Sequence, residues 1–136
     1  VRVKGDKNGL GWRIAIEKPT RESQSVEQIL KLSDLAIATS GDYRNYREID
    51  GVAYSHIIDP NTGWPVTHQL ASVTVAEKDC LMADGWATML LVLGPKAGYA
   101  MAVENQLAAM FVERNGDDFF VKHTPQFLQL TSGEVE

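Results

Sequence analysis

The sequence predicts an α+β domain in which a mixed, mainly antiparallel sheet carries a small number of grouped helices. Three observations favour this class. Short runs that alternate apolar and polar residues occur at 11–17 and again at 70–77. Two connections between β-prone runs contain the Asp-Gly or Asn-Gly pair that is typical of tight hairpins. Helical periodicity is confined to one stretch of the second half, whereas a doubly wound parallel sheet would alternate strands and helices throughout.

The first part of the chain is predicted to consist of strands. Residues 11–17 alternate with period two and stop at a lysine-proline pair, so they predict a half-buried strand. Residues 1–5 read as the tail of a strand that is already under way. Two further strands are expected at 26–32 and 35–39, where the apolar runs are short enough to allow a helical turn instead.

A β-hairpin is predicted around the Asp-Gly pair at positions 50–51. The flanking runs, 43–49 and 52–58, are β-prone, and the central residues of such a turn need positive φ. The second run leads into residues 59–65, where two prolines and a glycine predict a rigid loop. The hairpin is therefore expected to deliver His56 to the rim of that loop.

The second half is predicted to contain one strand, a pair of helices and two closing strands. Residues 70–77 alternate as a strand, and Asp79 is a candidate N-cap for the first helix, which a Gly-Pro pair ends. An Asn-Gly turn joins the closing strands. The expected helices are 81–93 and 96–104, and the expected strands are 108–114 and 118–122.

The composition excludes several kinds of function. Of the 136 residues, 44% are hydrophobic and 23% are charged, and no apolar run is expected to span a bilayer. The net charge is −5 and the Lys and Arg residues form no cluster, so nucleic acid is not an expected partner. Cys80 is the only cysteine, which excludes an internal disulfide and a cysteine-rich zinc site.

Asp84 and Thr88 are the first candidate site. They lie four residues apart on a predicted helix and so share one face. A carboxylate and a hydroxyl are oxygen donors that suit Mg²⁺, which needs only one or two carboxylates when waters and substrate phosphates complete its shell. The residues alone leave an alternative open, in which Asp84 interacts with the helix dipole and Thr88 bonds to the backbone.

His56 and the turn at residues 38–43 are the other candidates. A held imidazole can act as a general base towards a hydroxyl, and a half-buried strand histidine with a satisfied ring is the alternative. The small-residue turn could bind a phosphate through amides and hydroxyls, or simply join two strands. His68 and His123 have no partner at metal-ligand spacing and are expected to be surface or packing residues.

Four ordered motifs closely resemble the family of FAD:protein FMN transferases, the ApbE family. They are Ala-Thr-Ser-Gly-Asp-Tyr-Arg at 38–44, Tyr-Ser-His-Ile-Ile-Asp-Pro-Asn-Thr-Gly at 54–63, Ser-Val-Thr-Val at 72–75 and Ala-Asp-Gly-Trp-Ala-Thr at 83–88. The similarity extends from Trp12 to about Leu130. It implies an ApbE-like fold related to the T-fold, with residues 1–136 as the C-terminal part of a flavin transferase domain whose N-terminal half is absent.

The resemblance also implies a role for particular residues. Asp84 and Thr88, with the backbone carbonyl of Ala87, would hold Mg²⁺ against the pyrophosphate of FAD. The segment from His56 to Pro60 would line the flavin site, and Ile58 would touch the cofactor. The implied cofactor-binding residues are His56, Ile58, Asp59 and Pro60. His56 is also the implied catalytic base, which deprotonates the attacking threonine.

The activity implied by the resemblance is Mg²⁺-dependent transfer of FMN from FAD to a threonine hydroxyl of an acceptor protein, with release of AMP. The acceptors would be flavoprotein subunits of electron-transport complexes. An FAD-binding carrier and an FAD pyrophosphatase remain open. The full-length protein is expected in the periplasm, held at the inner membrane by an upstream lipid anchor, and this chain alone is expected to be inactive. An uncovered sheet edge favours a homo-oligomer.

Overall fold

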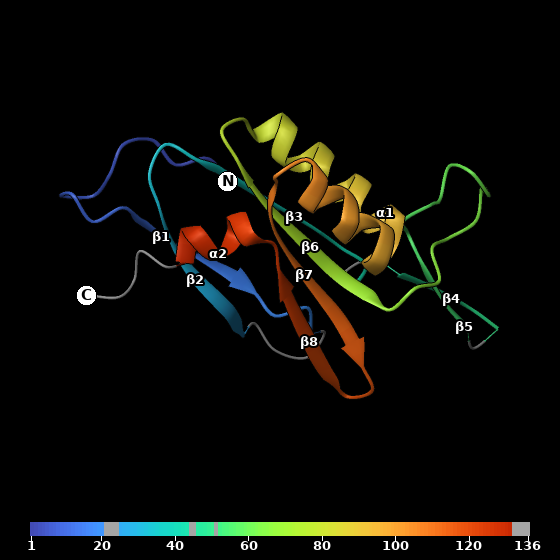
Figure 1. Cartoon of the computed structure of the whole chain (residues 1–136). Helices are drawn as coiled ribbons and strands as arrows, with labels where there is room; N and C mark the ends of the chain where they lie inside the picture. Colours follow the sequence, from blue (N-terminus) through green and yellow to red (C-terminus); the bar gives the residue numbers. More distant parts are fainter. Residues whose placement is uncertain (21–24, 44–45, 51, 132–136) are drawn as a thin grey trace.

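The computed structural model describes residues 1–20, 25–43, 46–50 and 52–131. These residues form eight strands and two helices, which Figure 1 shows along the chain. The strands are β1 (Trp12–Glu17), β2 (Val26–Leu32), β3 (Ala36–Gly41), β4 (Tyr46–Ile49), β5 (Val52–Ser55), β6 (Leu70–Glu77), β7 (Ala108–Asn115) and β8 (Asp118–His123). The helices are α1 (Cys80–Glu104) and α2 (Pro125–Thr131).

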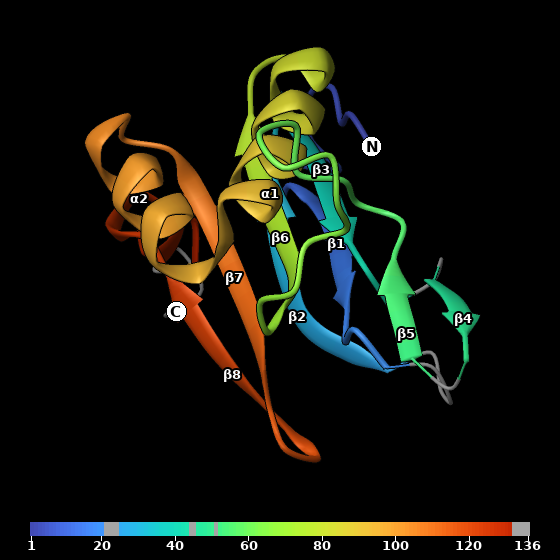
Figure 2. The ribbon, with the colours of Figure 1, turned by 90° about the vertical axis from the view of Figure 1, so that its right-hand side faces the viewer.

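The strands are divided among three sheets. The largest has the order β3-β6-β7-β8, while β1 pairs with β2 and β4 pairs with β5. Every strand pair in the described part of the chain is antiparallel. Figure 1 and Figure 2 show α1 on one face of the four-stranded sheet, with the β1-β2 pair and α2 on the other face. The predicted α+β class, with a mainly antiparallel sheet and grouped helices, is confirmed.

The central strands are buried on both faces, so the domain has two apolar clusters. On β7, Ala109 and Phe111 pack in the cluster shared with α1, whereas Met110 and Val112 pack in the cluster shared with β1, β2 and α2. Successive side chains of a strand point to opposite faces. The alternation predicted for β6 likewise has no solvent side, because its first seven residues are all buried.

Local signals in the sequence set the start of α1 and a break within it. The Asp79 side chain accepts hydrogen bonds from the N–H groups of Leu81 and Met82 at 2.9 and 3.3 Å, as an N-cap does. Gly94 has φ 79° and ψ −177°, which interrupts the helix immediately before Pro95. The predicted division into two helical segments at the Gly-Pro pair is therefore confirmed inside one continuous element.

The expectation that no apolar stretch could span a bilayer needs correction. By length and composition, α1 is the one helix among the described residues that could cross a membrane. Packing accounts for only part of its apolar character, because 33% of its apolar stretch is buried inside the domain. The helix buries one row of residues against the sheet and is broken at Gly94. The buried residues are Ala83, Ala87, Leu90, Leu91, Gly94, Gly98 and Ala102. Length and apolar composition alone do not distinguish a core helix from a helix that spans a membrane.

The β4-β5 hairpin is shorter than predicted. Its strands pair from Tyr46 opposite Ser55 to Ile49 opposite Val52, and Asp50 has the positive φ, 52°, that the turn requires. Its turn partner at position 51 lies outside the described residues. The predicted second strand ran to position 58, but residues 56–58 belong to the loop instead. Figure 2 shows the hairpin projecting from the rest of the domain.

Helix α2 was not predicted. Seven residues form too short a helix to be stable alone. Phe127 is fully buried in the cluster formed with β2 and β7, and burial of a phenylalanine contributes about 1.5–3 kcal/mol. The Thr124 hydroxyl donates to the carbonyl of Leu107 at 2.7 Å and accepts from the N–H of Ala109 at 2.9 Å, which ties the start of α2 to β7.

The chain ahead of β1 pairs with β3, in agreement with the predicted strand tail. Arg2 forms an antiparallel bridge with Ala36, and the N–H of Val3 donates to the carbonyl of Leu35 at 2.8 Å. These contacts cover only the first part of the outer edge of β3. The edge from Ala38 to Gly41 instead borders a cleft.

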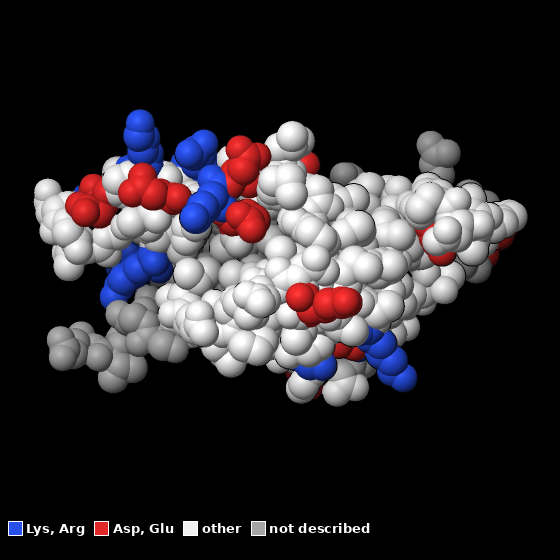
Figure 3. All heavy atoms as spheres, turned by 45° about the horizontal axis from the view of Figure 1, so that its top comes forward, with Lys and Arg blue, Asp and Glu red and all other residues white. Residues whose placement is uncertain are grey.

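The side of the molecule that carries α1 has few charges. In Figure 3, positive and negative side chains lie close together near one end of this face, and much of the remainder is uncharged. The outward side of α1 contributes exposed apolar side chains at Leu81, Met82, Met89 and Leu93.

Candidate functional site

A cleft of about 620 Å³ lies along the outer edge of β3. Its walls come from elements that are distant in sequence: β1, β3, the first turns of α1 and the loop after β5. The lining residues are Val1, 14–17, 37–41, Tyr43, His56, Ile57, Asp84 and Thr88. The cleft thus contains three of the predicted site residues, His56, Asp84 and Thr88, together with most of the small-residue turn.

Asp84 and Thr88 share the cleft side of α1, as their spacing predicted. Both are exposed, whereas Ala83 and Ala87 are fully buried against the sheet. The Asp84 carboxylate has no hydrogen-bond or ion-pair partner within the described ranges, so its oxygens are accessible to a ligand in the cleft. Ala87 lies in the apolar cluster, and only its backbone carbonyl could contribute to a site.

Ser40 places a further hydroxyl group beside Thr88. Its Oγ atom lies 3.0 Å from the Thr88 Oγ1 atom, within hydrogen-bond distance. The bond joins β3 to α1 and shows that the Thr88 hydroxyl is directed to the cleft. The sequence alone did not pair Ser40 with Thr88, because the two residues are 48 positions apart.

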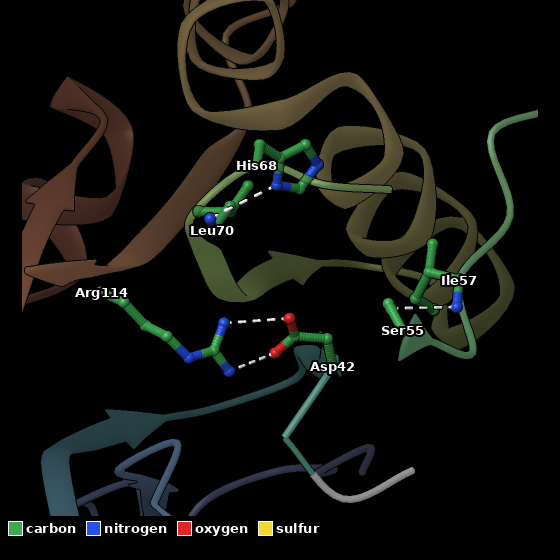
Figure 4. A network of polar contacts seen from close by, with 6 residues as sticks. All are labelled: Asp42, Ser55, Ile57, His68, Leu70 and Arg114. Carbon is green, nitrogen blue, oxygen red and sulfur yellow. Dashed lines mark hydrogen bonds and ion pairs between the residues drawn. The ribbon is translucent and has the colours of Figure 1, made fainter. Parts of the chain in front are cut away.

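The turn after β3 is held by an ion pair with β7. Arg114 donates from Nη1 to Asp42 Oδ2 at 2.9 Å, and Nη2 donates to Oδ1 (Figure 4). A Cβ atom at Gly41 would lie 2.6 Å from the ring of Tyr43, so only glycine allows Tyr43 to fold back over this strand end. The small residues of the motif therefore shape the part of the cleft that Tyr43 lines.

The loop that carries His56 is closed by its own hydrogen bonds. The Ser55 hydroxyl accepts from the N–H of Ile57 at 3.1 Å (Figure 4), and Ile58 bridges to Pro65. Asp59 accepts from the N–H of Asn61 at 2.8 Å through Oδ1. His56 is exposed and lines the cleft.

The remaining cofactor-binding predictions fall outside the cleft lining. Ile58, Asp59 and Pro60 do not contribute to it, and the Asp59 carboxylate serves the turn. Ile57, which the sequence analysis did not single out, lines the cleft beside His56. Because β5 ends at Ser55, strict alternation no longer separates these two side chains. The end of the strand is a signal that could have identified Ile57.

The other two histidines pack within the domain, as expected. His68 accepts the N–H of Leu70 at Nδ1, 3.3 Å away (Figure 4), and its ring fills the space left by the absent side chain of Gly94. His123 stacks on Phe127 with ring centroids 5.1 Å apart. Burial lowers the pKa of His123 below its ordinary value, against the opposite effect of the Glu27 carboxylate.

The donor set fits a magnesium ion that is shared with a phosphate ligand. No group of three His, Cys, Asp or Glu residues within the described segments could hold a metal ion. Mg²⁺ commonly uses one or two carboxylates and takes its other ligands from waters and substrate phosphates. One unpaired carboxylate on the same side of α1 as the Thr88 hydroxyl matches that pattern.

The fold and the site define an α+β domain with a polar cleft along the edge of its main sheet. The model of the ApbE family matches residues 1–111. The chain belongs to the ApbE family.

Curated relatives carry the name FAD:protein FMN transferase. The chain is 52% identical over 120 residues to the protein of Vibrio cholerae serotype O1, a match that covers 88% of this chain and 36% of the relative. Identity to the Escherichia coli K12 protein is 44% over 119 residues, covering 88% of this chain and 34% of the relative. The chain thus spans about a third of the length of these relatives.

Solved structures of the family share the fold. The apo form of the Pseudomonas stutzeri flavinyl transferase ApbE has a TM-score of 0.78 and 46% identity, covering 97% of this chain and 41% of that one. The flavin transferase ApbE from Vibrio cholerae has a TM-score of 0.80 and 46% identity, covering 95% and 41%.

Proposed function

We propose that this chain is the C-terminal part of a Mg²⁺-dependent FAD:protein FMN transferase. The observation that carries the proposal is that Asp84 and Thr88 of α1 line the same cleft as His56 of the loop after β5. Membership of the ApbE family and the printed names of the relatives support the same activity. The N-terminal portion of the domain would then supply the remaining walls of the site.

The pyrophosphate of FAD is assigned to the α1 side of the cleft. A pyrophosphate and the Asp84 carboxylate repel each other unless a divalent cation lies between them. Asp84, Thr88 and the carbonyl of Ala87 are the protein oxygens that we assign to Mg²⁺. When bound, the ion neutralises negative charge as the phosphoanhydride bond breaks.

His56 is assigned as the general base. The threonine oxygen of the acceptor forms a bond to the phosphorus of the FMN moiety, and the bond from that phosphorus to the bridging oxygen breaks. AMP leaves with the electron pair of that bond, and His56 takes the hydroxyl proton. The flavin is assigned to the loop that begins at His56, with Ile58, which is 48% exposed, as its apolar contact, and with Asp59 and Pro60 beside it.

The proposed surroundings of the protein follow from the family resemblance. We assign the full-length protein to the periplasm, at the inner membrane through an upstream lipid anchor, with flavoprotein subunits of electron-transport complexes as acceptors. Self-association is also proposed, because β8 is an edge strand of the main sheet and α1 has an exposed apolar side.

Incubation of the full-length protein with FAD and Mg²⁺, with and without an acceptor protein, tests the activity. A transferase forms covalently bound FMN and AMP only when the acceptor is present. A pyrophosphatase would form free FMN and AMP without acceptor, and a carrier would form neither product. Either of those results would contradict the proposal.

A pair of matched variants tests the residue assignment. Asp84→Asn removes the carboxylate charge and is expected to abolish Mg²⁺-dependent transfer. Asp117→Asn removes an equal charge from an exposed turn, remote in sequence from the cleft residues, and is expected to leave transfer unchanged. Full activity of Asp84→Asn would show that the cation is bound elsewhere.

A further inference from the structure

The hydrogen bond between Ser40 and Thr88 has a location that stability does not explain. It links β3 to α1 at the surface of the cleft, with the two oxygen atoms 3.0 Å apart. A hydroxyl pair exposed to water gains little net free energy, because water offers each partner a comparable bond. The contact does, however, determine the direction of the Thr88 hydroxyl.

A threonine within a helix has a competing choice. Its Oγ1 atom can bond to the carbonyl three or four residues earlier, which for Thr88 is the carbonyl of Gly85 or Asp84. The bond to Ser40 selects the conformation that faces β3 and the cleft instead. Ser40 thereby presents the Thr88 oxygen on the same side of α1 as the Asp84 carboxylate.

Which of the two hydroxyls donates the hydrogen bond also affects how Thr88 can bind a cation. A hydroxyl has one proton and two lone pairs. If the Thr88 hydroxyl donates the hydrogen bond to Ser40, both lone pairs of the Thr88 oxygen stay available to a cation. If Ser40 donates, one lone pair is occupied. A bound cation makes the Thr88 hydroxyl a stronger donor and so favours the first arrangement.

We propose that Ser40 is a positioning residue, which accepts a hydrogen bond from the Thr88 hydroxyl and holds the Thr88 oxygen towards the phosphate-bound cation. This inference rests on the proposed function. It adds a residue, Ser40, that acts on the cation only through Thr88. Groups that orient metal ligands in this way typically change metal affinity by about 10- to 100-fold when they are removed.

Direct metal binding tests the inference without relying on turnover. Mn²⁺ is also bound by oxygen ligands, and its free concentration can be followed by electron paramagnetic resonance in the presence of FAD. Ser40→Ala is expected to weaken Mn²⁺ binding about 10- to 100-fold, while the unfolding temperature without metal stays close to that of the wild type. Ser40→Thr retains the hydroxyl and is expected to restore affinity.

A neighbouring hydroxyl pair is the control. Thr39 and Thr74 lie 2.8 Å apart between β3 and β6, and Thr74 is fully buried outside the cleft lining. Thr74→Val removes a bond of the same kind without touching Thr88, and it is expected to leave Mn²⁺ affinity unchanged. Unchanged affinity in Ser40→Ala would overturn the inference.

Three variants separate the possible failures. If Ser40 were itself a ligand, Ser40→Cys would gain affinity for Cd²⁺ through its softer sulfur atom, and a positioning role would be wrong. Asp84→Asn and Thr88→Val are expected to lose Mn²⁺ binding. If both retained it, the cation site of the proposed function would be wrong, and the inference with it. If they lost it while Ser40→Ala did not, only the inference would be overturned.

Discussion

Arg114 at the end of β7 and Asp42 just after β3 form an ion pair across β6, the strand that lies between them. The two residues are 72 positions apart, and their side chains are 29% and 16% exposed. The Asp42 N–H donates to Ala71 of β6 at 3.1 Å, so the backbone and the side chain hold the same turn. That turn leads into Tyr43, which lines the cleft.

Arg114→Ala is expected to destabilise the domain by about 1–3 kcal/mol, since a partly buried carboxylate would lose two charged hydrogen bonds. Arg114→Lys should recover only part of the loss, because an ammonium cannot bond both carboxylate oxygens in the fork geometry. Urea unfolding measures both values. Arg13→Ala, at an exposed position of β1, is the control and should change stability by less than about 0.5 kcal/mol. An equal effect of both alanine variants would contradict the importance of the pair.

Replacing two glycines of α1 by alanine should change the stability of the domain in opposite directions. Gly94→Ala should cost about 1–3 kcal/mol in backbone strain, because its φ of 79° with ψ of −177° is almost restricted to glycine. A contact of 2.8 Å with the ring of His68 would add to this cost. Gly85→Ala meets no atom within 4 Å and should stabilise the helix by roughly 0.5–1 kcal/mol. Thermal unfolding compares the two, and stabilisation by Gly94→Ala would refute the observed break.

His123 is expected to make stability depend on pH. Burial lowers its pKa in the folded state below the ordinary value of 6.5, so the unfolded chain binds more protons as the pH falls below 6.5. The contribution of His123 is therefore fully present above pH 6.5 and is lost as the pH falls through the lower folded pKa. The free energy of unfolding of His123→Gln, measured from pH 8 to pH 5, should fall less steeply than that of the wild type. Parallel curves would show that His123 does not carry this dependence.

Phe127 should anchor α2. Phe127→Ala is expected to cost about 3–5 kcal/mol, because it leaves a cavity where a fully buried ring packed. The exposed Gln129 is the matched position on the same helix, and Gln129→Ala should change stability by no more than about 0.5 kcal/mol. Hydrogen exchange would add a local measure, since loss of the anchor should expose the amides of α2. Persistent protection in Phe127→Ala would indicate another anchor.

Features that depend on neighbouring residues were predicted well. The cap at Asp79, the break at Gly94 and the turns at Asp50 and Gly116 follow from side-chain chemistry and φ within a few residues. The shared cleft side of Asp84 and Thr88 follows from helical periodicity. In each case the cause lies within a single turn of the backbone, so it is visible in the sequence.

Features that depend on distant residues were missed. The burial of α2 requires the surface formed by β2 and β7, and the two-sided burial of β7 requires α1 on one face and β1, β2 and α2 on the other. Ser40 reaches Thr88 only because β3 lies beside α1, and Ile57 reaches the cleft only because β5 ends at Ser55. Propensity and periodicity contain no information on such contacts.

By itself, the sequence determined the α+β class, the ends of most elements, and the residue types from which a cation and flavin site could be built. The tertiary structure alone decided which oxygen atoms share the cleft and in which direction the Thr88 hydroxyl points. The physical reason is that strand pairing and helix packing bring together residues 48 and 72 positions apart. Those distances depend on the whole arrangement of sheet and helix rather than on any local run of residues.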